Sequence, residues 1–423
     1  MNRKAIIQKF REEGILNGAG YYLGRLLSEI EMRTIGPVTA RFASVCPTRI
    51  VLKNRMMMDY SDNTRALYEY LVKNGYTEKY QIIWVVSEKK RFRNYKQKNV
   101  RFVTAENRYG WNSPLAYYYG ATAKYFFFTH YNADLNRFHC PGQITVNLWH
   151  GCGYKGAGIQ KKELFRSTAS DRFDYALVPG PLFAEAKKDF WHCPVEKILP
   201  LGYPRYDWMM NPGKSRKEIM TLLFQWEGRG KTVIWLPTFR QSKIIAYQEG
   251  EIEFSCSLPG IESEEELKQL NEELKKREML LIIKKHPLQS VWNRSRDDSN
   301  IRFLSEEKLD RADIRLYQLL GVCDALLTDY SSAAVDFMLL DRPIGFVLSD
   351  YAQYKEKRGF VFEDPLQYMP GEKLYDYKDI AAFLGHVAEE KDLFREERRG
   401  LMPAMHQVTD CYCRRIADRF GIK

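Results

Sequence analysis

The sequence has no long apolar run. Nowhere among its 423 residues is there the stretch of about 18 apolar residues that a membrane-spanning helix needs. The first residues, MNRKAIIQKFREEGI, also lack the apolar segment of a secretory signal peptide. The longest apolar stretches, such as residues 125–128, have the length of a buried strand. These absences predict a cytoplasmic protein and leave peripheral membrane binding open.

Cysteine spacing excludes two further classes of protein. The eight cysteines are scattered, none forms a CxxC pair, and only seven histidines accompany them, so no zinc-binding spacing is present. Scattered thiols in a chain of this length do not indicate a disulfide scaffold either. We therefore expect neither a structural metal nor a fold held together by disulfides.

What the chain does have is an excess of positive charge. Lysine and arginine total 65 against 54 acidic residues, which gives a formal net charge of +11. The apolar share of 45% is ordinary for a folded protein, and the length favours two or three domains. A basic surplus favours anionic partners, namely nucleic acid, an anionic membrane surface or phosphorylated substrates, without choosing among them.

Short apolar strands alternate with helical patterns along most of the chain, which is typical of parallel α/β sheets. The expected strands are residues 49–53, 81–86, 124–128, 144–149, 175–178 and 197–201, then 232–236, 279–284, 301–304, 325–328 and 344–348. Polar, turn-forming residues at 204–215 separate the two sets. We therefore predict an α/β protein with two Rossmann-like domains facing a central cleft, where ligands bind at the carboxyl ends of strands.

The predicted organisation has three parts. Residues 1–45 form one or two helices, either an accessory helix packed on the first domain or a basic helix lying on anionic lipid. Residues 46–210 form the first α/β domain, and residues 211–423 form the second. Within the second domain, Ser263 and Glu266 are predicted to form a capping box at the start of a helix.

Four strand ends carry residues that suit phosphate chemistry. The first is Trp149-His150-Gly151, followed by Lys155, and four glycines stand within eight residues of this loop. Glycines let the backbone approach a ligand closely, and Lys155 adds positive charge. His150 is therefore a candidate catalytic residue, although a lone histidine is most often structural.

Two further strand ends lie in the second half. Thr238 and Arg240 follow one strand, and arginine commonly binds phosphate through its planar fork. Lys285 and His286 follow the next strand. Taken singly, Arg240 fits a surface ion pair equally well, and a histidine before proline is often a plain loop residue.

The fourth strand ends in Asp329, which is followed by Tyr330, Ser331 and Ser332 and then by a helical pattern. Either serine would cap that helix, with free N–H groups and a hydroxyl available to a phosphate. An ordinary serine cap explains one of the two serines but does not need both. Because basic and hydroxyl groups occupy strand ends of both halves, the sequence favours a phosphate-binding cleft over four unrelated loops.

This array resembles the CDP-glycerol glycerophosphotransferase family, which builds the glycerol phosphate or ribitol phosphate chains of wall teichoic acids. Trp149-His150-Gly151 with Lys155 is similar to that family's Trp-His-Gly-x-x-x-Lys loop. Further similar segments, in the family's order, are Asp62-Asn63, Gly202-Tyr203-Pro204-Arg205-Tyr206-Asp207, Pro237-Thr238-Phe239-Arg240, Lys285-His286-Pro287, Thr328 through Phe337, and Leu340-Asp341-Arg342-Pro343.

The resemblance implies a GT-B architecture in which the second domain binds a CDP-alditol donor and the first admits the acceptor. A terminal acceptor hydroxyl would attack the donor's β-phosphate, and CMP would leave. His150 would be the general base, and His286 a second catalytic residue. The residues expected to bind the donor or its phosphates are Gly151, Lys155, Thr238, Arg240, Lys285, Asp329, Ser331 and Ser332.

The same resemblance implies partners and a location. The acceptor would be an anionic polymer linked to polyprenyl diphosphate, and the enzyme would bind peripherally to the cytoplasmic face of a bacterial membrane. No cofactor and no metal are expected, because the sequence lacks a DxD-like acidic site and basic side chains would replace Mg²⁺. Nucleic acid is not expected as a partner.

One departure from the family pattern concerns the loop after His150. Cys152-Gly153-Tyr154 stands where the family usually has Thr-Pro-Leu, and we expect Tyr154 to place a bulky polar edge near His150. Two alternatives remain at this point. One is a polysialyltransferase-like enzyme using CMP-sialic acid, for which no acidic base motif is found; the other is a non-enzymatic binder of anionic membranes or nucleic acid.

Overall fold

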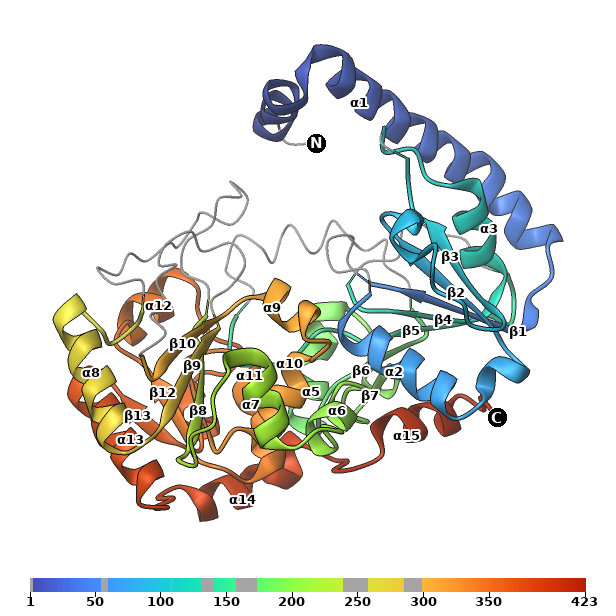
Figure 1. Cartoon of the computed structure of the whole chain (residues 1–423). Helices are drawn as coiled ribbons and strands as arrows, with labels where there is room; N and C mark the ends of the chain where they lie inside the picture. The colour runs from blue at the N-terminus through green and yellow to red at the C-terminus, as the bar shows by residue number, and fades with distance from the viewer. Residues whose placement is uncertain are drawn as a thin grey trace.

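Two parallel sheets form the framework of the protein (Figure 1). The computed structural model describes residues 3–54, 60–107, 109–130, 135, 140–156, 173–238, 258–284 and 299–423. Helices and loops surround both sheets, and the carboxyl ends of their strands face the junction of the two halves where the motif residues occur. The α/β class expected from the strand pattern is therefore confirmed.

Within the described residues, the first sheet has seven strands in the order β3-β2-β1-β4-β5-β6-β7. Its strands are β1 (Cys46–Lys53), β2 (Gln81–Val86), β3 (Val100–Thr104), β4 (Ala123–Phe128), β5 (Ile144–Asn147), β6 (Tyr175–Leu177) and β7 (Ile198–Leu199). The helical segments around it are α2 (Asp62–Lys73), η1 (Tyr76–Glu78), η2 (Lys89–Phe92), α3 (Pro114–Thr122), α5 (Pro181–Trp191), η3 (Val195–Lys197) and α6 (Tyr206–Met210). Leu52 of the central strand pairs with Trp84 on one side and with Phe127 on the other.

In the part of the chain that the structure describes, the second sheet has six strands in the order β10-β9-β8-β11-β12-β13. They are β8 (Thr232–Leu236), β9 (Leu280–Lys284), β10 (Ile301–Leu304), β11 (Ala325–Thr328), β12 (Ile344–Val347) and β13 (Glu372–Leu374). The accompanying helical segments are α7 (Arg216–Phe224), α8 (Glu264–Lys276), α9 (Glu306–Arg311), α10 (Leu316–Val322), α11 (Ala333–Phe337), η5 (Met338–Leu340), α12 (Tyr351–Lys357), η6 (Pro365–Tyr368), α13 (Tyr377–Ala388), α14 (Arg395–Met405) and α15 (Tyr412–Arg419).

All the predicted strands are present, and the described residues contain two further strands, β3 and β13, that were not predicted from the sequence. Both are edge strands, and both are short and only partly buried, so they lack the continuous apolar run that marks the central strands. Strand β5, predicted over residues 144–149, is shorter than expected. It ends at Asn147 because Trp149 takes a left-handed φ of 52°. This early ending turns the chain toward His150.

The predicted capping box is half present. Ser263 begins α8, and its hydroxyl accepts the N–H of Glu266 at 3.1 Å. The carboxylate of Glu266 accepts the N–H of Glu262, at 2.7 Å, instead of that of Ser263. The reciprocal bond is therefore displaced by one residue.

The amino-terminal segment is helix α1 (Arg3–Phe42), which runs past α3 and projects beyond the first sheet in Figure 1. Gly14, with φ 78° and ψ 165°, breaks it into two helices. The second of these packs on the first half: Ser28 accepts the N–H of Asn112 at 2.7 Å, and Gly24 lies so close to the Tyr109 carbonyl that a Cβ would meet it at 1.9 Å. Among the described residues, no helix combines the length and the apolar character needed to cross a bilayer.

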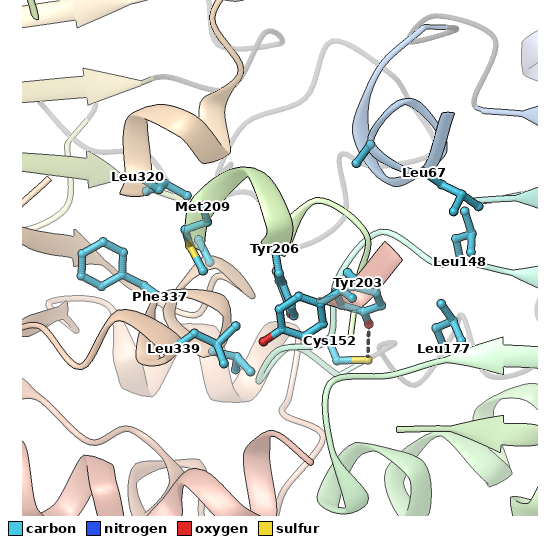
Figure 2. Packing of buried hydrophobic residues seen from close by; sticks show 14 of the residues in the cluster. Leu67, Leu148, Cys152, Leu177, Tyr203, Tyr206, Met209, Leu320, Phe337 and Leu339 are labelled. Atoms are coloured by element: carbon cyan, nitrogen blue, oxygen red, sulfur yellow. Dashed lines mark hydrogen bonds between the residues drawn. The ribbon is translucent and has the colours of Figure 1, made fainter. Parts of the chain in front are cut away.

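The two halves are joined by one continuous apolar core. Figure 2 shows part of this core, in which apolar side chains from both halves pack around the buried residues Cys152 and Tyr203. The hydroxyl of Tyr203 donates to the thiol of Cys152 at 3.2 Å. The labelled members are Leu67, Leu148, Cys152, Leu177, Tyr203, Tyr206, Met209, Leu320, Phe337 and Leu339. Because this core is shared, the strand ends of the two sheets hold a fixed relation to each other.

The carboxyl-terminal helix returns to the first half. Asp207 accepts the N–H groups of Tyr412 and Cys413, at 2.9 and 2.8 Å, at the start of α15. Phe420 then packs on Phe127 of β4, with ring centroids 5.9 Å apart. The divisions at residues 45/46 and 210/211 stay predictions.

Candidate active site

A tight turn at the end of β5 presents His150. Asn147 accepts the N–H of Trp149 at 2.9 Å, and Trp149 (φ 52°) and Gly151 (φ 134°) both have positive φ. The side-chain amide of Asn63 donates to the Trp149 carbonyl at 2.9 Å. Backbone strain of this kind persists where surrounding contacts impose it, and here they hold His150 at the sheet's carboxyl edge.

The His150 ring packs between aromatic neighbours. It stacks on His130 with a centroid distance of 4.0 Å and an interplanar angle of 5°, and it lies 4.1 Å from the Trp149 ring. A ring N–H hydrogen-bonds the backbone of Thr129. Because one nitrogen is the donor in that bond, the other carries the lone pair in the neutral imidazole.

The charge state of His150 follows from its surroundings. Solvent reaches the residue, but protein packs closely around the ring, and this desolvation lowers the pKa of His150 well below 6.5. The positive charges of His130, Lys187 and Arg205 lower it further. His150 is therefore neutral near pH 7, which is the state that a general base needs.

The His150 loop touches the second half at Ser332. A Cβ on Gly151 would lie 2.6 Å from the Ser332 hydroxyl, and a Cβ on Gly153 would lie 2.8 Å from the Ser332 backbone nitrogen. Glycine is thus required at both positions by close approach. The structure brings together His150, Gly151 and Ser332, which come from strand ends of different sheets.

The two serines differ in their contacts. Ser331 accepts the N–H of Ala333 through its hydroxyl at 3.3 Å. Ser332 is the residue at the start of α11, yet its hydroxyl makes no capping bond and instead faces the Gly151 backbone. One serine therefore caps the turn and the other meets the His150 loop.

Thr238 and Asp329 are bonded to each other. The fully buried carboxylate of Asp329 accepts both the N–H of Thr238, at 2.8 Å, and its hydroxyl. This pair ties the carboxyl end of β8 to that of β11, so Asp329 positions Thr238. Three other predicted site residues, Arg240, Lys285 and His286, lie outside the described residues.

Lys155 lies where the His150 loop pairs with the second half. It forms an isolated antiparallel bridge with Phe360, and the N–H of Gly156 donates to the Gly359 carbonyl at 3.0 Å. The Lys155 side chain is exposed. Tyr154 is fully buried, and its hydroxyl donates to the Tyr368 carbonyl at 2.9 Å. The expectation that Tyr154 offers a polar edge near His150 is therefore wrong, because the second half takes up that side chain.

Arg205, to which no role was assigned from the sequence, holds the site together. Its guanidinium donates to Asp62 at 2.8 Å, to the His150 carbonyl at 3.0 Å and to Asp336 at 2.8 Å. Arg205 and Asp336 are both buried, and the hydroxyls of Tyr206 and Tyr317 also donate to Asp336. The sequence did contain a signal for this role, because Asp62 and Arg205 both lie in segments that resemble the family's motifs.

In the part of the chain that the structure describes, no group of three or more histidine, cysteine, aspartate or glutamate side chains gathers as a metal site. A metal-free reaction stays a prediction.

Comparison with known proteins identifies a family. The model of the family described as CDP-Glycerol:Poly(glycerophosphate) glycerophosphotransferase matches residues 38–419. A teichoic acid ribitol-phosphate primase of Bacillus spizizenii is 26% identical over 52% of this chain and 55% of its own. A teichoic acid glycerol-phosphate transferase of Staphylococcus aureus is 28% identical over 80% of this chain and 84% of its own. The matched part of this chain thus spans about half of the first relative and most of the second.

The fold is also that of a solved structure, the wall teichoic acid polymerase TagF, with a TM-score of 0.71 at 21% identity over 95% of this chain and 97% of that one. This likeness confirms the expected GT-B architecture. The family match confirms the glycerophosphotransferase class and not the polysialyltransferase-like or non-enzymatic alternatives. With the family model covering nearly all of the sequence, the chain belongs to the CDP-glycerol:poly(glycerophosphate) glycerophosphotransferase family.

Proposed function

We propose that the protein transfers an alditol phosphate, either glycerol phosphate or ribitol phosphate, from a CDP-activated donor to the terminal hydroxyl of a lipid-linked teichoic acid or related polymer. CMP is the second product. The observation that carries this proposal is His150, a neutral imidazole on a loop whose Gly151 and Gly153 press against Ser332 at the start of α11 in the second half. The names of the relatives support both alditols, since they include ribitol-phosphate and glycerol-phosphate enzymes.

His150 acts as the general base. Its lone-pair nitrogen takes the proton from the acceptor hydroxyl, whose oxygen forms a bond to the donor's β-phosphorus. The bond from that phosphorus to the CMP oxygen breaks, and its electrons leave with CMP. The Thr129 backbone fixes the other ring nitrogen, which keeps the base aligned during the transfer.

The second half holds the donor. Asp329 accepts both the N–H and the hydroxyl of Thr238, so this pair fixes the carboxyl end of β8. The Ser331–Ser332 turn supplies hydroxyl groups at the start of α11, next to the His150 loop. Arg240, Lys285 and His286 supply the positive charge that stabilises the transferring phosphoryl group. Lys155 and the Gly151 backbone approach the same phosphates from the first half.

The acceptor's lipid places the enzyme at a membrane surface, which we propose is the cytoplasmic face of a bacterial membrane. Exposed large apolar side chains of α1 support this location. They are Ile15, Leu16, Leu23, Leu26, Leu27, Ile30, Ile35, Val38 and Phe42. A helix with such side chains beside basic residues binds an interface without spanning it.

The test is CMP release by the purified protein from CDP-glycerol, CDP-ribitol and CMP-sialic acid, each with lipid-linked acceptors. We expect acceptor-dependent CMP from one of the CDP-alditols and none from CMP-sialic acid, with activity unchanged by a chelator. No acceptor-dependent release from either CDP-alditol would refute the proposed function. Loss of activity on chelation, restored by Mg²⁺, would refute its metal-free form.

A further inference from the structure

Lys187 is a cation that the mechanism above leaves without a role. It lies on α5, behind the His150 loop, and it is half-buried. Its ammonium nitrogen is 5.0 Å from the centroid of the Trp149 ring and 4.2 Å from that of Phe190. The centroid of the Trp191 ring lies 5.6 Å from the same nitrogen. These aromatic faces partly stabilise the charge, but they accept no conventional hydrogen bond.

Among the described residues, no carboxylate balances this charge. Within the described residues Lys187 forms no ion pair, whereas its neighbour Lys188 pairs with Glu185 at 2.5 Å. Burial lowers the pKa of Lys187. Holding a half-buried ammonium without a counter-ion costs free energy, which binding of an anion would recover.

The position of Lys187 indicates which substrate would bring that anion. Gly151 and Gly153 press against Ser332 of the second half, while Cys152 between them faces Tyr203 and Lys187. Lys187 thus lies on the first-half side of the loop, away from the proposed donor site. Its charge still acts on His150, so the two side chains serve the same reacting region.

We propose that Lys187 binds the phosphodiester of the acceptor's terminal unit and thereby places that unit's hydroxyl at His150. The inference rests on the proposed function, because it assigns one anion to one substrate of that reaction. In an alditol phosphate polymer the terminal hydroxyl and the nearest phosphodiester belong to the same unit, so a cation beside the base meets the anion when the hydroxyl meets the base.

Binding also adjusts the base. While the acceptor is absent, the charge of Lys187 disfavours protonation of His150. A bound phosphodiester offsets that charge, so the proton affinity of His150 rises as the acceptor arrives. Lys187 therefore couples acceptor binding to the strength of the base.

The kinetic test uses Lys187→Met, which removes the charge but keeps the apolar stem, and Lys187→Arg, which keeps a charge. Lys188→Met is the matched control on the same helix. Loss of a charged hydrogen bond predicts an acceptor KM about 10- to 100-fold higher for Lys187→Met, with the donor KM unchanged, and partial recovery in Lys187→Arg. An unchanged acceptor KM, or an equal rise in the donor KM, would overturn the assignment.

A second measurement needs no turnover and no variant. Acetylation of Lys187 and Lys188 by acetic anhydride is followed by mass spectrometry with and without purified poly(glycerol phosphate), and with uncharged dextran as control. We expect poly(glycerol phosphate) to protect Lys187 and not Lys188, and dextran to protect neither. Protection without CMP release from any CDP-alditol would refute the proposed function and leave the anion site standing; CMP release without protection would refute the anion site.

Discussion

The guanidinium of Arg205 donates to the carboxylate of Asp336 at 2.8 Å, and this buried ion pair joins the two halves of the protein. Arg205 also bonds the His150 carbonyl and Asp62 of the first half. The same side chain therefore sets the relation between the halves and the position of the loop that carries the proposed base. The motif that contains Arg205 therefore forms a contact between the two halves.

Arg205→Met tests the buried ion pair between Arg205 and Asp336. It leaves Asp336 buried without its cation, so we expect the free energy of unfolding to fall by about 3–5 kcal/mol, as measured by denaturant titration. Arg311→Gln, which removes an exposed ion pair with Glu307, is the control and should change stability little. Equal stability of the two variants would show that the buried pair does not hold the halves together.

His150→Asn tests the base. Asparagine keeps a polar group but cannot take the proton, so kcat should fall by about 10²- to 10⁴-fold while the Kd for the CDP donor stays nearly constant. The control is His192→Asn at the exposed, left-handed end of α5, where asparagine is readily tolerated. If donor binding is lost and residual turnover is normal, His150 belongs to the donor site instead.

The pH profile tests the electrostatics around His150. The base works when deprotonated, so kcat/KM rises with pH through its pKa, and the lowered pKa places this acid limb below pH 6.5. The positive groups facing the ring are His130 from the end of β4, Lys187 from α5 and Arg205. His130→Phe keeps the stacked ring but removes its charge.

With that charge removed, the pKa of His150 rises and the acid limb moves to higher pH, by about one unit or less. The measurement is kcat/KM between pH 5 and pH 9 for both proteins. A limb that stays in place, or moves to lower pH, would contradict the role assigned to His130.

Gly153→Ala tests the contact between the His150 loop and the second half. Its methyl group would lie 2.8 Å from the Ser332 backbone, so we expect a loss of about 1–3 kcal/mol in unfolding free energy and a lower kcat. Gly400→Ala is the control, because a Cβ there meets nothing within 4 Å in helix α14 and should stabilise the protein slightly. Full activity of Gly153→Ala would show that the loop and α11 do not act as one unit.

The apolar side of α1 is tested by changing Leu23, Leu26 and Ile30 to serine together. These exposed residues are three and four positions apart, so they share one face of the helix. We expect co-sedimentation with anionic phospholipid vesicles to fall by about tenfold or more, while Leu222→Ser, an exposed leucine on α7, has no effect. Unchanged vesicle binding would place the membrane contact elsewhere.

The sequence by itself determined the sheets and the region of the site. Central strands such as residues 232–236 are continuous apolar runs, because both faces of a parallel sheet are covered, and such runs are visible without any tertiary information. The ends of these strands then locate His150, Thr238 and Ser332, since parallel strands deliver their carboxyl ends to one edge.

Only the tertiary structure decided what those residues contact. Arg205 meets Asp336 across 131 residues of sequence, and Tyr154 is drawn into the second half by the Tyr368 carbonyl. Lys187 packs against Trp149 because α5 lies next to the turn at Trp149. The left-handed backbone of that turn cannot be predicted from hydrophobic periodicity in the sequence. Local patterns specify strands and turns, but the partner of a buried charge depends on which distant segments share the core.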